Sequence, residues 1–71
     1  MTPNQIIDQQ IEKLENEIQS LDCQISHCED ILNENASQTG WEDAKKALIL
    51  LKTEKINSIE ILRHIKQKSN Q

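Results

Sequence analysis

Apolar residues recur in the first half of the chain at alternating intervals of four and three residues. The series is Ile7, Ile11, Leu14, Ile18, Leu21, Ile25, Cys28 and Leu32. This seven-residue spacing places every member on one stripe of a helix and is typical of a coiled-coil seam. One flank of the stripe is occupied by an acidic row, made up of Asp8, Glu15, Asp22 and Glu29. The pattern therefore predicts a long helix whose apolar stripe is bordered by negative charge.

Capping signals mark the start of two helices. The first is Thr2-Pro3-Asn4-Gln5, in which Thr2 is an N-cap, Pro3 suits the first helical position and Gln5 can bond back to the cap. Thr39 and Glu42 form a second capping box, and the stretch before it has no periodicity and favours turns. The sequence thus predicts a single domain, 1–71, with helix 1 over about 3–33, a polar turn over about 34–39 and helix 2 over about 40–68.

A short polar connection makes consecutive helices antiparallel neighbours. In such a hairpin the residue numbers of any two facing residues add up to the same value, and that value defines the register of the two helices. One register places bases of the second half opposite the acidic row. It places Asp8 by Lys66, Asp22 by Lys52, Glu29 by Lys45, and Glu15 between Lys55 and Arg63. A neighbouring register sets Ile7 by Ile65, Leu21 by Leu51 and Leu32 by Trp41. The predicted fold class is all-α, a two-helix antiparallel coiled-coil hairpin, although the Ile/Leu pattern of the first seam also fits one continuous helix in a parallel dimer.

The second helix holds more apolar surface than one neighbouring helix can cover. Its surplus side chains fall on two shoulders, with Ile49 and Ile56 on one and Leu50, Ile61 and Ile65 toward the other. We expect these five residues to bind a partner, together with Trp41 unless Trp41 closes the turn end of the core. A chain of 71 residues is near the lower limit for a self-sufficient core. We therefore expect a second copy, or a helix of another protein, to complete a four-helix bundle.

Composition and charge support this view and limit the partners. The chain has one Gly, one Pro, one aromatic residue and a formal net charge of −4. Residues 1–38 hold eight acids and one base, whereas residues 39–71 hold four acids and seven bases, so the two halves attract each other. No apolar run approaches the roughly 20 residues needed to cross a bilayer, and no signal-peptide pattern begins the sequence. We expect a cytoplasmic protein that does not bind membranes.

No group of residues matches a catalytic or metal-binding motif. Cys23, His27 and Cys28 come closest to a ligand set, but Cys28 belongs to the seam and a closed zinc site needs four ligands. His64 lies on the polar side of helix 2, where nothing else indicates phosphotransfer. Paired acids in an apolar pocket, a Gly-rich phosphate loop and an HExxH motif are all missing from the sequence. We expect neither enzymatic activity nor a cofactor, a metal or a small-molecule substrate.

Two classes of function fit these observations. The first is a non-enzymatic protein–protein interaction module, such as an adaptor, a co-chaperone or a small inhibitor. The alternative is a small nucleic-acid-binding hairpin dimer, or an acidic inhibitor that mimics nucleic acid, although the net negative charge disfavours direct binding of nucleic acid. The overall plan of two helices, a polar turn, acidic charge and spare apolar surface resembles the small co-chaperones of type III secretion needle proteins. That resemblance implies a heteromeric complex with a second chaperone that sequesters the needle protein.

Overall fold

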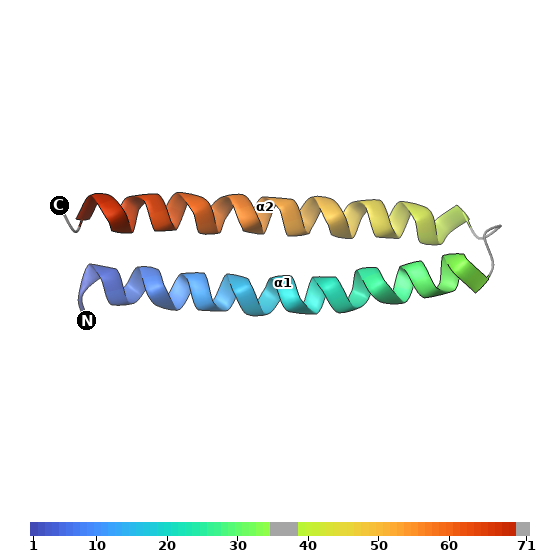
Figure 1. Cartoon of the computed structure of the whole chain (residues 1–71), viewed down its shortest axis with the longest axis horizontal. Coiled ribbons are helices and arrows are strands. Elements are labelled where there is room, and N and C mark those ends of the chain that lie inside the picture. The colour runs from blue at the N-terminus through green and yellow to red at the C-terminus, as the bar shows by residue number, and fades with distance from the viewer. Residues whose placement is uncertain (35–38, 70–71) are drawn as a thin grey trace.

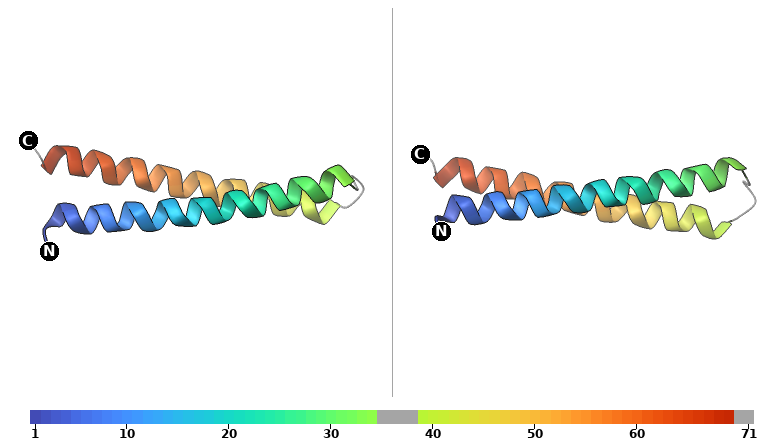
Figure 2. Two further views of the ribbon diagram at one scale, coloured as in Figure 1. Left: turned by 60° about the horizontal axis from the view of Figure 1, so that its bottom comes forward. Right: turned by 90° about the horizontal axis from the view of Figure 1, so that it is seen from below.

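Two long helices form a hairpin. The computed structural model describes residues 1–34 and 39–69, with α1 spanning Pro3–Glu34 and α2 spanning Thr39–Ser69. The helices run side by side in opposite directions, so that both termini lie at one end of a rod (Figure 1) that measures 53 × 16 × 13 Å. They cross at a shallow angle along their length (Figure 2). The all-α hairpin is confirmed and the alternative of one continuous helix is wrong, while the predicted turn lies largely outside the described residues.

The start of α1 is fixed by a reciprocal cap. The Thr2 amide donates a hydrogen bond to Oε1 of Gln5 at 3.0 Å, and the Gln5 amide donates one to Oγ1 of Thr2 at 3.2 Å. These bonds satisfy amide groups that no helical carbonyl can reach. The predicted capping box at Thr2 is therefore confirmed. The cap predicted for the second helix depends on the side chain of Thr39, which lies outside the described part of the chain.

The core is a single layer between the two helices. α1 buries Ile11, Leu21, Ile25 and Cys28 from the predicted stripe, and α2 adds Ile59. Even Cys28 keeps 4% of its surface exposed, and no side chain in the described ranges is completely shielded from water. Two helices cannot surround a residue on all sides, so burial stops short of what a globular core provides.

The face of α2 that meets α1 has its own seven-residue spacing, and half of its positions are lysines. This inner seam, buried or half-buried throughout, consists of Trp41, Lys45, Leu48, Lys52, Lys55, Ile59, Leu62 and Lys66. Lysine can lay its methylene stem on an apolar surface while its ammonium group reaches water or a carboxylate. The expectation that Leu51 would cover this face is corrected, because Leu51 remains 46% exposed. Ile65, which the second register set against Ile7 and which the sequence also placed on a shoulder, is exposed to the same extent. Turning α2 to bury these side chains would move the lysines away from the acids of α1.

Candidate interaction surface

Ion pairs line the flank of the hairpin that the acidic row borders. Every acid of the row meets a base of α2, as the antiparallel register predicts. The side chains involved stay about a third to somewhat more than half exposed, so each pair contributes only about 0–1 kcal/mol and mainly sets the register. In order along α1, the N–O distances are 2.7 Å for Asp8–Lys66, 3.8 Å for Glu15–Arg63, 2.6 Å for Asp22–Lys52 and 3.8 Å for Glu29–Lys45.

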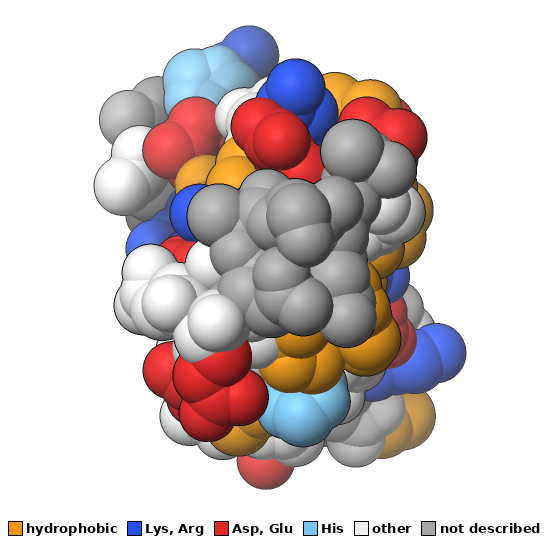
Figure 3. Space-filling model, turned by 90° about the vertical axis from the view of Figure 1, so that its right-hand side faces the viewer, with side chains coloured by type: hydrophobic (Ala, Val, Ile, Leu, Met, Phe, Trp, Pro, Cys, Tyr) orange, Lys and Arg blue, Asp and Glu red, His pale blue; other side chains and the backbone are white. Residues whose placement is uncertain are grey.

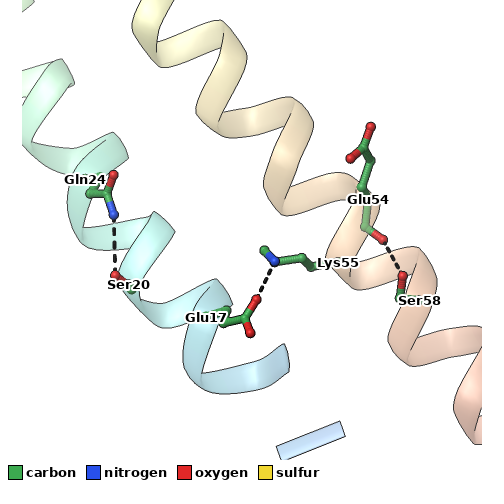
Figure 4. A network of polar contacts seen from close by, with 6 residues as sticks. All are labelled: Glu17, Ser20, Gln24, Glu54, Lys55 and Ser58. Atoms are coloured by element: carbon green, nitrogen blue, oxygen red, sulfur yellow. Dashed lines mark hydrogen bonds and ion pairs between the residues drawn. The ribbon is translucent and has the colours of Figure 1, made fainter. Parts of the chain in front are cut away.

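Lys55 departs from that arrangement. The expected position near Glu15 is wrong, since Lys55 crosses to the opposite flank and donates a hydrogen bond to Oε2 of Glu17 (Figure 4). This bond, assisted by the positive charges of Lys55 and Lys13, holds the pKa of the Glu17 carboxyl below its ordinary value, against a smaller opposing effect of removal from water. Both flanks of the hairpin thus have charged links between the helices, but the flank of Glu17 has only one among the described residues.

Ile49 and Ile56 lie on the flank with the acidic row. Both are exposed, and they border a hollow that also contains Asp22, Glu29 and Lys52. A helix placed on these two isoleucines would also cover the charged groups beside them. Removing ion pairs from water has a cost that their mutual attraction does not always offset. This shoulder is therefore apolar but closely surrounded by charge.

A second seven-residue series runs along α2 on the opposite flank. We call it the outer seam. Its large apolar members are the exposed residues Leu51, Ile61 and Ile65, and Leu50 projects beside them with 62% of its surface in water. Figure 4 shows the carboxylate of Glu54, in the middle of the series, directed away from α1. The complete outer seam is Ala44, Ala47, Leu51, Glu54, Ser58, Ile61, Ile65 and Lys68.

An apolar groove opens beside the first residues of the outer seam. It has a volume of about 600 Å³ and is lined mainly by Cys28, Trp41, Ala44 and Ala47, with His27 at its rim. The ring of Trp41 meets the ring of His27 edge to face, with centroids 5.9 Å apart and planes at 80°. Figure 3, viewed from the turn end, shows apolar side chains at the surface between charged ones. The groove exists because two alanines leave room that larger side chains would fill.

Trp41 is half-buried and lies at the edge of the core. Its predicted neighbour Leu32 lines a separate hollow with Glu42 and Lys45 on the flank of the acidic row. Trp41 thus borders the core and also forms a wall of an open groove.

The other residues considered for chemistry lie apart from one another. Cys23 is an exposed free thiol and Cys28 a buried one, and within the described ranges no three His, Cys, Asp or Glu side chains are placed to hold a metal ion. His64 is exposed beside Glu60 and Ile61 in a shallow hollow of α2. Neither described helix contains a stretch long and apolar enough to cross a membrane.

The residues predicted to bind a partner fall on two separate flanks, as the shoulders in the sequence indicated. Ile49 and Ile56 accompany the acidic row, whereas Leu50, Ile61 and Ile65 accompany the outer seam. Sequence reasoning misses Ala47 and Leu51 as surface residues, because hydropathy assigns Leu51 to the core. The signal that finds them is the unbroken four-and-three spacing of the outer seam.

Comparison with known proteins adds no relative to this picture. No protein family model matches the chain, and neither does any curated protein or solved structure at a significant level.

Proposed function

We propose that this hairpin is a non-enzymatic protein–protein interaction module whose second helix binds another helix. The observation that supports this most strongly is the number of large apolar side chains that α2 leaves in water. They are Ile49, Leu50, Leu51, Ile56, Ile61 and Ile65. Apolar groups that recur along one helix and stay exposed to water in the described part of the chain are typical of a surface used for association.

The thin core supports the same proposal. Five described side chains are buried, and none is completely shielded. A hairpin of this kind gains little from burial alone relative to the entropy lost on ordering the chain. Association with a further helix would add apolar contact where the hairpin lacks it. A co-chaperone, which the resemblance to needle-protein chaperones implies, is one form of this function, in which α2 covers an apolar helix of a client protein.

The distribution of charge favours a protein partner over a nucleic acid. Five of the eight basic side chains are engaged with carboxylates of α1, which leaves Lys13, Lys46 and Lys68 without such a pair among the described residues. Binding of nucleic acid relies on several bases that face the phosphates together. Retention on heparin and salt-sensitive RNA binding at neutral pH would favour the nucleic-acid alternative.

A variant of α2 tests the proposal. Replacing all six exposed apolar residues of α2 by Gln, a good helix former, preserves the inner seam and should leave the helical content unchanged. We expect the wild-type chain to self-associate or to retain a protein from the source cell, and the variant to do neither. A control replaces Ile6, which is exposed on α1, by Gln. The proposal fails if the six-residue variant associates as well as the control.

A further inference from the structure

The outer seam is complementary to itself in one arrangement. We infer that a second copy of this chain packs against it, α2 to α2 and antiparallel, with Leu51 of one copy against Ile61 of the other. This inference rests on the proposed function and specifies its partner and contact surface. It uses the flank of α2 opposite the acidic row, where the described residues form one charged link between the helices, and it leaves Ile49 and Ile56 outside the contact.

The order of residues along the outer seam supports the antiparallel arrangement. With Leu51 against Ile61 of the second copy, Ala47 falls against Ile65 and Glu54 against Ser58, and the two-fold axis repeats each layer. In this register each large apolar side chain of the seam faces either an alanine or an apolar side chain of similar size. The Ser58 hydroxyl donates its one hydrogen to the Glu54 carbonyl within its own helix at 3.1 Å; in the dimer, rotation of the hydroxyl would exchange that bond for one to the Glu54 carboxylate of the second copy. Shifting the register by one heptad would set Leu51 against Glu54.

Charge selects the same arrangement. In a parallel pair, each residue of the seam meets itself, so Glu54 would face Glu54 and Lys68 would face Lys68. In the antiparallel pair, Lys68 lies by Ala44 and Asp43 of the second copy. Neither Asp43 nor Lys68 has an ion pair within the described part of the chain. Like charges in direct contact destabilise a helix pair, and opposite charges at its ends select orientation.

The apolar groove gives this contact a place to begin. Ala44 and Ala47 form part of its wall, and the antiparallel register brings Ile65 of the second copy alongside Ala47. An isoleucine from one helix that enters a space left by alanines on the other is knob-into-hole packing. The flank with the acidic row offers no such fit, because its hollow is edged by Asp22, Glu29 and Lys52.

Disulfide trapping tests the orientation. In a background that carries Cys23→Ser and Cys28→Ala, Ala47→Cys and Ile65→Cys are made as separate chains, because Cys28 is a free thiol that lines the same groove as Ala47. Mild oxidation of the mixture should give the mixed dimer, identified by mass, whereas either chain alone should give almost none. Within one helix the two positions are about 27 Å apart, so they cannot bridge inside a copy. Efficient crosslinking of each chain by itself would mean a parallel pair and would overturn the arrangement.

Charged substitutions test the surface. Leu51→Lys with Ile61→Lys should raise the dissociation constant of the dimer by more than about a hundredfold, since four charges would enter apolar layers. Ile49→Lys with Ile56→Lys adds the same charge to the other shoulder and should leave the dimer intact. Equal loss in both variants, or no loss in the first, overturns the assignment. If the unmodified chain sediments as a monomer, the second copy is excluded, while the proposed function still stands or falls with the six-residue Gln variant.

Discussion

Lys52 allows the contribution of a lysine stem in the inner seam to be separated from that of its charge. Its ammonium group lies 2.6 Å from Oδ1 of Asp22, and its side chain is 33% exposed. Lys52→Ala removes both the stem and the charge, whereas Lys52→Met removes the charge and keeps a chain of similar length and apolar character. The two variants therefore differ mainly in the contact that the stem makes with α1.

The expected magnitudes follow from the burial of the side chain. Lys52→Ala deletes three methylenes that are about two-thirds covered, and at about 0.8 kcal/mol per buried methylene this costs about 1.5 kcal/mol. Loss of the ion pair adds about 0–1 kcal/mol, because half of the Asp22 side chain and a third of the Lys52 side chain remain in contact with water, which screens the charges. We expect Lys52→Met to change the free energy of unfolding by less than about 1 kcal/mol, and Lys52→Ala to lower it by about 1.5–2.5 kcal/mol.

Urea unfolding followed by circular dichroism measures both variants at one protein concentration. Asp22→Asn completes a double-mutant cycle with Lys52→Met, whose coupling energy should stay below about 1 kcal/mol. If Lys52→Met destabilises as much as Lys52→Ala, charge rather than the stem holds the helices together, and the description of the inner seam is refuted. If Lys52→Ala has no effect, the stem does not pack on α1 at all.

Three further substitutions probe the core, the cap and the charged link of the opposite flank. Ile59→Ala removes the one described side chain of α2 that is buried, and it should cost about 2–4 kcal/mol in chemical unfolding; a cost under about 1 kcal/mol would show that α2 does not rest on this residue. Thr2→Ala removes an acceptor for the Gln5 amide and should cost at most about 1 kcal/mol, seen as faster hydrogen exchange of that amide; unchanged exchange would contradict the cap. The Glu17 carboxyl should titrate below an ordinary glutamate in NMR spectra, and Lys55→Met should return it toward the ordinary value. Because the pKa of Glu17 is lower in the folded state than in the unfolded state, the stabilisation from Glu17 is fully present above the unfolded-state pKa and is lost as the pH falls through the folded-state pKa. Equal titration of Glu17 in the wild-type protein and in Lys55→Met would contradict the hydrogen bond.

The sequence predicted the hairpin because several of its signals agree. The acidic row and the bases of the second half require the antiparallel register, and the structure places Asp22 by Lys52 and Asp8 by Lys66 as that register predicts. The cap at Thr2 was equally predictable, since its chemistry is contained within one helical turn.

The rotation of α2 about its axis was harder to predict. Hydropathy alone assigns Leu51 to the core and Lys52 to the surface, yet the structure leaves Leu51 the more exposed of the two. Lysine is amphipathic, and its stem can replace leucine on an apolar surface when a carboxylate lies within reach. Simple apolar counting does not include this property. The same property explains Lys55, whose long side chain can reach either flank and meets Glu17 rather than Glu15.

The division of α2 into two seams has a direct consequence for mass in solution. If the inner seam serves the hairpin and the outer seam serves a second copy, sedimentation equilibrium of the unmodified chain should give twice the 8.2 kDa of one copy. That mass should fall toward the single-chain value on dilution over about a hundredfold range of concentration. A mass of one chain at every concentration, with the helices intact by circular dichroism, would contradict the self-association of the outer seam.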